Sequence, residues 1–356
     1  MKHKRLFIPG PVEVEPEILQ AMGTPMIGHR SSEFKELYAG VQPKLQELLY
    51  TANPVFLSTS SATGIMEGSI RNLVAKRCLT IVCGAFSQRW HGIVQECSKA
   101  GDTIDIEWGK AVRPEQVDAA LATGKYDLVA LVHNETSTGI MNPLAAVAEV
   151  VKKYPDIMLA VDTVSSMTAV KIEVDKLGLD VCLAGTQKAF ALPPGLCVFT
   201  VSQRAMERSA DMKGKGFYFD FQAFREYHEK DNTPCTPSVS HIYALNVQLD
   251  RIFREGLENR FTRHQEMANR CRNWARQNFA LFPEEGYESV TLTTATNNRG
   301  IDITSLNKAL AARDATIGNG YGKLKDKTFR IAHMGDCTLD QLNELLANID
   351  ECLERR

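Results

Sequence analysis

The sequence lacks any apolar run long enough to cross a bilayer, which takes about 20 residues, and neither sign of charge dominates it. Its 41 Lys and Arg residues nearly balance its 43 Asp and Glu residues, and the net charge is −2. This balance gives no electrostatic reason to expect nucleic-acid or membrane partners. The apolar stretch near the N-terminus ends at Pro9, too early for a signal peptide. We therefore expect a cytoplasmic protein without nucleic-acid or membrane partners.

Cysteine pairs and P-loop glycines are absent as well. The nine cysteines are scattered, odd in number and form no Cys-x-x-Cys pair. They are typical of reduced thiols in a cytosolic protein, and we expect no metal site. The turn at 60–64 is rich in small hydroxyl residues, but it lacks the spaced glycines and the following lysine of a P-loop.

Short apolar runs alternate with helical segments along most of the chain, which is typical of α/β folds. Several runs contain only Val, Ile, Leu and similar residues, as expected for strands buried on both faces. The predicted strands are 55–57, 79–82, 103–107, 128–132, 157–161, 181–184 and 197–201. The predicted helices are 65–74, 88–100 (closed by Gly101), 114–121 and 143–153, and the last two open with proline.

The pattern changes towards the C-terminus. Residues 239–278 are predicted to be mostly helical, with an interruption near Gly256. Short strands near 290–294 and 329–332 and helices near 305–313 and 339–353 follow. We predict a large domain at 16–255, with a mostly parallel sheet flanked by helices, and a smaller α+β domain at 256–356. Residues 1–15 are predicted to form an N-terminal arm that contributes to the active site.

Two residues with complementary chemistry each follow a predicted strand. Asp162 ends one apolar run, and Lys188 follows a later one. Ligands of open α/β sheets bind beyond the carboxyl ends of the strands, so these side chains should meet. A lysine amine can hold an aldehyde and a carboxylate can hold a ring nitrogen, as pyridoxal phosphate requires. Taken singly, Lys188 could be an exposed lysine in a loop, and Asp162 could be the N-cap of a helix. Their occurrence together favours the cofactor.

Three further segments reach the same edge of the sheet. Ser61 and its neighbours begin a helix, where they could hold a phosphate or simply cap the helix. Phe86 or the nearby Trp90 could stack on a cofactor ring, although a phenylalanine is ordinarily a core residue. Segment 133–139 offers hydroxyl groups that could bond the cofactor, or it could be a simple polar loop.

Arg330 lies inside an apolar stretch. An unpaired charge in such surroundings is costly. A bidentate bond to a substrate carboxylate would explain its position, and so would an internal salt bridge.

In their order along the chain, these pieces resemble the class V aminotransferases of pyridoxal-phosphate fold type I, above all the alanine–glyoxylate and serine–pyruvate branch. The resemblance covers nearly the whole chain: segments 9–11, 28–30, 61–64, 133–139, 161–162, 187–188, 193–195 and 329–331. It implies a fold type I transferase that uses pyridoxal 5′-phosphate to move amino groups. Two departures stand out, because the branch often has tryptophan in place of Phe86 and a His-Cys-type pair in place of Thr63-Gly64.

The resemblance implies a role for each matching position. Lys188 forms the internal aldimine and shuttles the α-proton, and Asp162 holds the pyridine nitrogen. Arg330 takes the substrate α-carboxylate, and Gly10 lies in a loop that helps to position the substrates. The other implied cofactor contacts are Ser61, Ala62, Thr63 and Gln187 around the phosphate, Phe86 on the ring, Ser137 near the ring, and Thr233 and Thr236 from a partner subunit. A homodimer with shared active sites is therefore implied.

The implied substrates are alanine or serine as donor and glyoxylate or pyruvate as acceptor. Segments 29–30 and 232–234 also resemble phosphoserine aminotransferases, which use 2-oxoglutarate in serine biosynthesis. There a His-Arg pair helps to hold the substrate phosphate, so Arg30 is a candidate substrate residue. Alternatively, Arg30 forms a structural ion pair with Glu33 or Glu36.

Two other classes are less favoured. A cysteine desulfurase of this family needs a nucleophilic cysteine shortly before the carboxylate-binding arginine, whereas Cys337 follows Arg330. A non-catalytic subunit with this fold would be expected to lose Lys188 or Asp162, and both are present.

Overall fold

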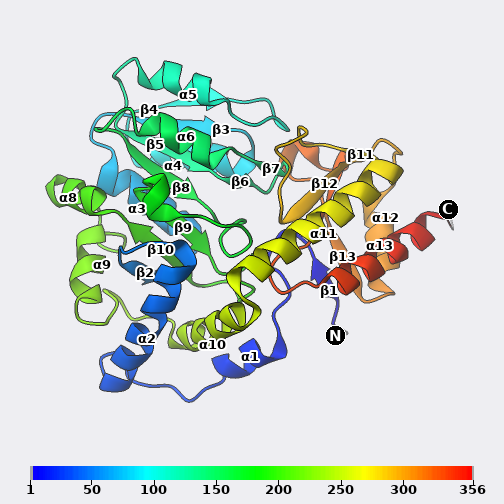
Figure 1. Cartoon of the computed structure of the whole chain (residues 1–356), viewed down its shortest axis with the longest axis horizontal. Coiled ribbons are helices and arrows are strands. Elements are labelled where there is room, and N and C mark those ends of the chain that lie inside the picture. Colours follow the sequence, from blue (N-terminus) through cyan, green and yellow to red (C-terminus); the bar gives the residue numbers. More distant parts are fainter. Residues whose placement is uncertain (1–2, 355–356) are drawn as a thin grey trace.

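Two large β-sheets form the framework of the protein, seen in the computed structural model of Figure 1, and a third sheet among the described residues has only two strands. The structure describes residues 3–354, so the first two residues of the predicted arm and the last two of the predicted small domain lie outside the described residues. The strands are β1 (Arg5–Phe7), β2 (Val55–Ser58), β3 (Cys78–Val82), β4 (Gly101–Asp105), β5 (Leu128–Val132), β6 (Asn134–Glu135), β7 (Ile140–Met141), β8 (Met158–Asp162), β9 (Val181–Gly185), β10 (Cys197–Val201), β11 (Ala280–Leu281), β12 (Leu292–Thr296), β13 (Ala315–Asn319) and β14 (Thr328–Ala332).

The larger sheet has seven strands in the order β2-β10-β9-β8-β5-β3-β4. Strands β9, β8, β5, β3 and β4 run parallel, and β10 is antiparallel to both of its neighbours. The prediction of a mostly parallel sheet is therefore confirmed. Because β2 and the five parallel strands point the same way, their carboxyl ends share one edge of the sheet.

Helices cover both faces of the larger sheet (Figure 1). In β8, Leu159 and Val161 pack with α1, α2, α5, α6 and α10 on one face, while Met158 and Ala160 pack with α3, α4, α8 and α9 on the other. The helices are α1 (Pro16–Met22), α2 (Ser32–Leu49), α3 (Ala62–Leu73), α4 (Ala85–Glu96), α5 (Pro114–Leu121), α6 (Leu144–Val151), α7 (Val174–Leu177), α8 (Gln203–Asp211), α9 (Phe221–His228), α10 (Val239–Glu255), α11 (Leu257–Asn278), α12 (Ile303–Ala311) and α13 (Leu339–Glu354), with a 3-10 turn η1 (Gly322–Leu324). Burial on both faces explains the uninterrupted apolar runs of the sequence.

The smaller sheet combines both ends of the chain. Its order is β1-β13-β14-β12-β11, and β1 runs parallel to β13 with Leu6 opposite Thr316. Helices α11, α12 and α13 pack on it around Trp274, Leu306 and Leu346. Helix α10 ends at Glu255 and α11 begins two residues later, where the sequence predicted an interruption. The division of the chain into domains near residue 255 stays a prediction.

The prediction of a helix that closes at Gly101 was wrong at its C-terminal end. Helix α4 ends at Glu96, and Ser98 adopts the left-handed conformation (φ 54°) in the turn that follows. Gly101 is instead the first residue of β4. A β-carbon at Gly101 would lie 2.7 Å from Val94 Cγ1, so the glycine is needed for close packing of strand and helix rather than for ending the helix.

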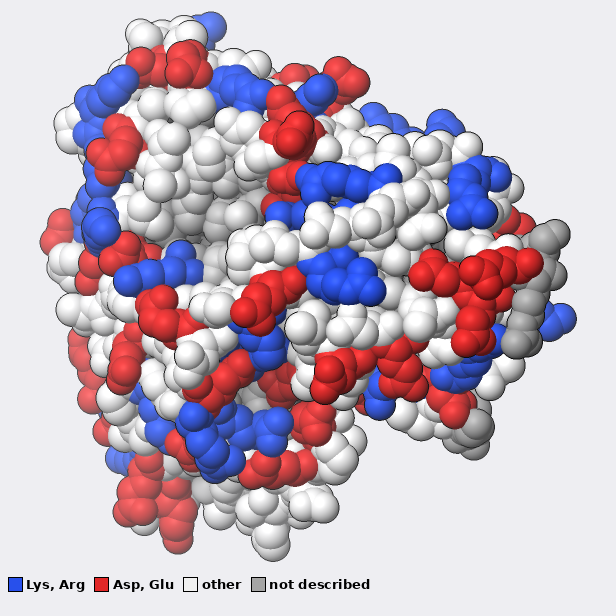
Figure 2. Space-filling model, turned by 45° about the vertical axis from the view of Figure 1, so that its right-hand side comes forward, with Lys and Arg blue, Asp and Glu red and all other residues white. Residues whose placement is uncertain are grey.

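The surface carries charges of both signs. On the face shown in Figure 2, Lys and Arg side chains are interspersed with Asp and Glu side chains. Across residues 3–354, no helix has the length and apolar character needed to cross a bilayer.

Buried histidines predict a loss of stability in acid. Burial lowers the pKa of His133 to about 4 and that of His333 to about 3. An unfolded histidine has a pKa near 6.5. Below that pH these two histidines are therefore protonated in the unfolded chain while they remain neutral in the folded one. Stability present above pH 6.5 is therefore lost as the pH falls, by about 2 kcal/mol for each histidine at pH 5.

Urea unfolding at pH 7 and pH 5 checks this expectation. The variant His333→Gln keeps a group that can bond Thr293, the present partner of the ring, but it cannot titrate. Its stability should fall less between the two pH values than that of the parent, whereas the exposed His3→Gln control should follow the parent. Equal losses in all three proteins would refute the assignment.

Candidate functional site

Loops that follow β2, β3, β5, β8 and β9 surround one cavity of about 210 Å³ at the carboxyl edge of the large sheet. Seven of the predicted site residues line it: Ser61, Ala62, Thr63, Phe86, Asp162, Gln187 and Lys188. These residues are far apart in sequence and come together because parallel strands end at the same edge.

Lys188 reaches into this cavity from the loop after β9, with only 7% of the residue exposed. Its amine donates to Thr136 Oγ1 at 2.9 Å and to Ser165 Oγ at 3.0 Å. Burial lowers the pKa of this amine, although the nearby charges of Asp162 and Glu135 act in the opposite direction. A larger share of the amine is therefore neutral near pH 8 than for a free lysine, as a nucleophile requires.

The N-terminal segment passes directly beside Lys188. Gly10 has a φ of +96°, and a β-carbon there would lie 3.0 Å from Lys188 Cγ. The Val12 N–H also bonds the Gln187 carbonyl at 3.0 Å. The structure thus brings Gly10 to the lysine, and any larger residue at this position would displace it.

Asp162 ends β8 on the cavity wall and is 5% exposed. Its Oδ1 accepts the Val164 N–H at 2.7 Å, and the side chain has no other hydrogen bond within the described residues. Burial raises the pKa of this carboxyl. The second oxygen has no hydrogen-bond donor among the described residues, and a ring N–H in the cavity that Asp162 lines would supply one.

Phe86 lies in the first turn of α4, and a buried carboxylate fixes that turn. Glu135 is fully buried and accepts the Ser87 N–H at 2.9 Å and the Phe86 N–H at 3.3 Å. A negative charge is favourable at a helix N-terminus. The carboxylate packs so closely on Gly84 that a β-carbon there would lie 2.4 Å from Glu135 Cγ. The ring of Phe86 lies 5.0 Å from the Lys188 amine.

The opposite end of the cavity suits a phosphate group. Ser61 is the N-cap of α3, and its side chain makes no capping bond. Ala62 and Thr63 open the helix, whose first N–H groups have no partner within the helix. Gln187 lines the same cavity. These residues offer N–H and hydroxyl donors for an anion.

Arg330 lies on β14 of the small sheet and is 8% exposed. Its guanidinium donates to two backbone carbonyls, Asn319 O at 3.0 Å and Thr136 O at 3.2 Å. It forms no ion pair with a carboxylate of residues 3–354. The internal salt bridge considered from the sequence is therefore not found in this part of the chain, and the buried cation can still accept a carboxylate partner.

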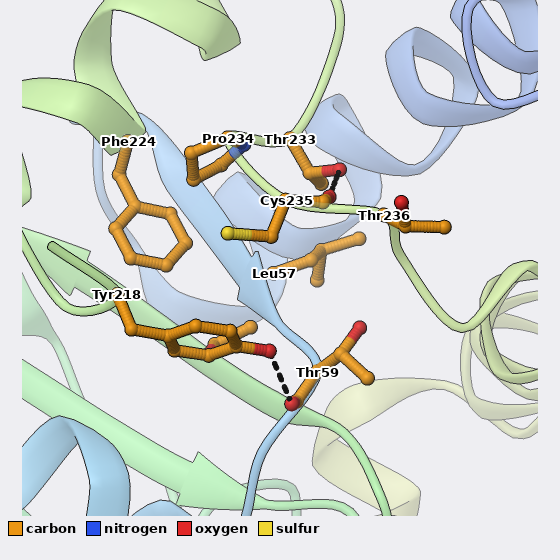
Figure 3. A pocket seen from close by; sticks show the side chains of 9 residues that line it. Leu57, Thr59, Tyr218, Phe224, Thr233, Pro234, Cys235 and Thr236 are labelled. Carbon is orange, nitrogen blue, oxygen red and sulfur yellow. Dashed lines mark hydrogen bonds between the residues drawn. The ribbon is translucent and has the colours of Figure 1, made fainter.

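Arg30, Thr233 and Thr236 lie outside this cavity. Thr233 and Thr236 line a separate pocket, where Figure 3 shows their loop above Leu57 and Thr59 and facing the rings of Tyr218 and Phe224. Arg30 bonds the same loop, at Asn232 Oδ1 (2.9 Å) and Thr233 O (3.1 Å). The ion pair of Arg30 with Glu33 or Glu36 is not found among the described residues.

Ser137 is turned away from the cavity. Its hydroxyl donates to Glu135 Oε1 at 2.6 Å and accepts the Ala85 N–H at 2.9 Å. Thr136, one position earlier, lines the cavity and bonds Lys188. The hydroxyl that contacts Lys188 is therefore that of Thr136, and the bond of Ser137 near the cofactor ring stays a prediction.

Sequence reasoning missed Glu135, Ser165 and Arg89. Arg89 lines the cavity, its guanidinium carbon lies 5.0 Å from the centre of the Phe86 ring, and it has no hydrogen bond or ion pair within residues 3–354. Glu135 follows the apolar run 128–132 by three residues, but nothing near it in the sequence indicates which group its carboxylate binds. Ser165 lies three residues beyond Asp162, in a segment that carries several hydroxyl groups.

Comparison with known proteins identifies the family. The family model for aminotransferase class V matches residues 15–320. This chain belongs to the class V aminotransferases. It is 40% identical to an uncharacterized aminotransferase of Methanocaldococcus jannaschii, over 99% of this chain and 93% of that protein. It is 33% identical to the L-aspartate–glyoxylate aminotransferase of Paracoccus denitrificans, over 94% of this chain and 87% of that protein. The resemblance found in the sequence is confirmed.

Solved structures agree with this assignment. An alanine–glyoxylate aminotransferase from Nostoc sp. superposes with a TM-score of 0.94 and 30% identity, over 99% of this chain and 96% of that one. The class V aminotransferase described here is thus a pyridoxal-phosphate-dependent transaminase of fold type I. Its cavity fits the cofactor: Lys188 offers a buried amine for the aldehyde, Asp162 a free acceptor for the ring nitrogen, and the start of α3 donors for the phosphate.

Proposed function

We propose that this aminotransferase moves an amino group from alanine or serine to glyoxylate or pyruvate. The observation that carries the proposal is Arg330, a buried guanidinium without a carboxylate partner in residues 3–354, close to the cavity of Lys188. A substrate α-carboxylate would pair with it. The Paracoccus and Nostoc relatives share glyoxylate in their names and differ in the amino donor, which supports glyoxylate as acceptor more strongly than it supports one donor.

Lys188 acts as nucleophile and general base in this proposal. Bound pyridoxal phosphate supplies an aldehyde carbon that links to amines and a ring that withdraws electrons from the substrate α-carbon. Thr136 and Ser165 hold the Lys188 amine in place, and its lowered pKa keeps part of it neutral. With a substrate bound, the neutral Lys188 amine would take the proton from the substrate α-carbon and later give a proton back, so that it would act first as general base and then as general acid.

The other residues of the cavity are assigned to holding the cofactor and orienting the substrate. We assign Asp162 to the ring nitrogen, whose positive charge its carboxylate stabilises, and Phe86 to the face of the ring. The phosphate is assigned to the ligands Ser61, Ala62, Thr63 and Gln187. Gly10 leaves room for the Lys188 side chain, and Arg330 fixes the substrate so that its amino group points towards the lysine.

Homodimerisation is part of the proposal. Thr233 and Thr236 do not line the cavity of their own chain, and Phe217, the residue before Tyr218 of their pocket, is 85% exposed. An exposed aromatic side chain is typical of an interface between protein chains, and the hydroxyl groups of the nearby loop have no role in the cavity of their own chain. We propose that this loop completes the phosphate site of a partner subunit. The cytoplasmic location stays a prediction.

Half-reactions on the purified holoenzyme test the function. Alanine, serine, phosphoserine, glutamate and aspartate are each added alone, and the loss of the absorbance of the lysine-bound cofactor is followed. Rapid conversion by alanine or serine supports the proposal, with glyoxylate expected to reverse it. A protein that reacts only with aspartate or glutamate would contradict the proposed donor class.

Phosphoserine aminotransfer is the second candidate, and Arg30 is the observation that favours it. This exposed arginine is tied to the loop of Thr233, so it would move with that loop into the site of a partner. There a second cation could hold a substrate phosphate. The matching donor is phosphoserine and the matching acceptor is 2-oxoglutarate.

Arg30→Ala separates the two candidates. With alanine as donor we expect kcat/KM to change less than about threefold, since a surface substitution usually costs under about 0.5 kcal/mol. With phosphoserine, if the enzyme accepts it, the loss should reach at least about tenfold, because a charged hydrogen bond contributes about 1.5–3 kcal/mol. Equal losses with both donors would mean that Arg30 only supports the loop.

A cysteine desulfurase is not supported. Cys337 lies near a different pocket, beside Arg5 and Met334, and burial raises the pKa of its thiol to about 12. No cysteine of the described residues lines the cavity of Lys188. A thiol that stays protonated and outside the cavity cannot attack a substrate there.

A further inference from the structure

A loop of the small sheet reaches across to the cofactor cavity. It runs from Asn319 at the end of β13 to Asp326 and contains η1. The Tyr321 ring packs on Phe86, with ring centres 5.4 Å apart and planes inclined by 33°. Two residues later, the Lys323 amine lies 4.1 Å from the centre of the Trp108 ring. Both aromatic partners belong to the part of the chain that forms the large sheet, because Phe86 opens α4 and Trp108 follows β4.

The loop is also fixed at its base. Asn319 Oδ1 accepts the N–H of Gly320 at 2.6 Å and that of Asp326 at 2.9 Å, which closes the loop. The Asn319 carbonyl accepts a bond from Arg330 at 3.0 Å. The arginine assigned to the substrate and the loop that carries Tyr321 therefore hold each other in position.

The ring of Tyr321 has two neighbours: Phe86, which is assigned to the cofactor, and Arg330, which is assigned to the substrate carboxylate. Its ring centre is 5.6 Å from the Arg330 guanidinium carbon, while its other neighbour, Phe86, is 5.0 Å from the Lys188 amine. Tyr321 remains 37% exposed, and its hydroxyl forms no hydrogen bond within residues 3–354. A ring that packs between Phe86 of the cavity wall and Arg330, and that stays partly open to solvent, is available to contact a ligand.

We propose that Tyr321 is the wall of the substrate site that limits the size of the substrate side chain. The inference rests on the proposed function. A substrate fixed by its carboxylate on Arg330 and by its amino group near Lys188 has one free substituent, its side chain, which must pass along the Tyr321 ring. Hydrogen, methyl and hydroxymethyl groups fit beside such a ring, whereas a branched side chain of four carbons collides with it.

Binding of unreactive substrate analogues tests the wall without turnover. Glycolate, lactate and 2-hydroxy-4-methylpentanoate carry the carboxylate but no transferable group, and they are titrated into the holoenzyme while the cofactor absorbance is followed. Tyr321→Ala should improve the dissociation constant of 2-hydroxy-4-methylpentanoate relative to that of lactate by at least about tenfold, the usual scale for a change in apolar pocket size. The same shift is expected in the half-reaction rates of leucine relative to alanine.

Two control variants make the result specific. Tyr321→Phe keeps the ring and should keep the parent preference. Lys323→Ala removes the neighbouring contact with Trp108 and should also keep it, because the wall itself is unchanged. An unchanged preference in Tyr321→Ala would overturn the inference, and so would an equal change in either control, which would point to the hydroxyl or to loosening of the loop.

Failure of this inference is distinguishable from failure of the proposed function. If the parent enzyme reacts with alanine or serine but Tyr321→Ala keeps the parent size preference, only the wall is refuted. If the parent enzyme reacts with neither, the proposed donor class fails before the variants are compared.

Discussion

Replacing Lys188 with alanine is expected to lower kcat by about 10⁴-fold, the upper range for removal of a general base. The variant also loses the amine that forms the covalent link to the cofactor, so the yellow colour of the lysine-bound cofactor should disappear. Pyridoxal phosphate should still bind, more weakly, through Asp162, Phe86 and the start of α3. Stopped-flow half-reactions with alanine and an absorbance titration with the cofactor measure the two effects.

The Lys188→Ala result needs a control for folding and a test of the role of Lys188 as general base. Lys176→Ala removes a lysine whose side chain is 75% exposed and whose amine pairs with Glu173 at 2.9 Å, and it should retain parent activity. A small amine such as methylamine in the buffer can take the α-proton in place of the missing side chain and should restore part of the rate. Parent-level turnover in Lys188→Ala would refute the whole assignment.

The second large effect is expected at Arg330. Removing one partner of a buried charge pair costs about 2–5 kcal/mol, which corresponds to roughly 30-fold to several-thousand-fold in binding. Arg330→Ala should therefore raise the KM for every 2-oxo acid and every amino donor, because all carry the same carboxylate. If the interaction is equally strong in the bound substrate and in the transition state, kcat changes little.

Arg272 provides a matched control for Arg330. It is also a largely buried arginine of the C-terminal part and donates to two backbone carbonyls, Glu288 O at 2.8 Å and Ser289 O at 2.7 Å, but neither carbonyl belongs to a residue that lines the cavity, whereas Arg330 bonds Thr136 of the cavity wall. Arg272→Ala should lower the melting temperature without raising KM. A KM increase confined to one substrate in Arg330→Ala would place the general carboxylate site elsewhere.

The candidate site could be predicted from the sequence because the ends of buried strands can be recognised in it. Uninterrupted apolar runs located β5, β8 and β9, and a parallel sheet brings their ends together. Lys188 and Asp162 could therefore be paired although nothing links them locally. The start of the helix at Pro114 and the interruption near Gly256 could also be predicted, because proline and glycine have strong positional preferences at the ends of helices.

Other features depend on contacts that a sequence does not display. Thr136 and Ser137 are adjacent hydroxyl residues, and only the turn after β6 decides which one faces the lysine. The carboxylate of Glu135 is used inside the protein, on the backbone of α4, so its charge gave no local pattern. Tyr321 lies in a short loop whose partners, Phe86 and Trp108, are more than two hundred positions earlier in the chain.

The strand that precedes Gly10 has a consequence for how the enzyme is made. Strand β1 leaves the ribosome well before β13, with which it pairs, because the two strands are far apart in the sequence. Domains generally fold in the order in which they emerge, so the large sheet can place Lys188 while the segment beside it still lacks its anchor. A nascent chain arrested before residue 315 would hold the lysine and Asp162 in an unfinished pocket. Catalytic competence is thus a property that the newly made polypeptide acquires only after β13 and β14 have been synthesised.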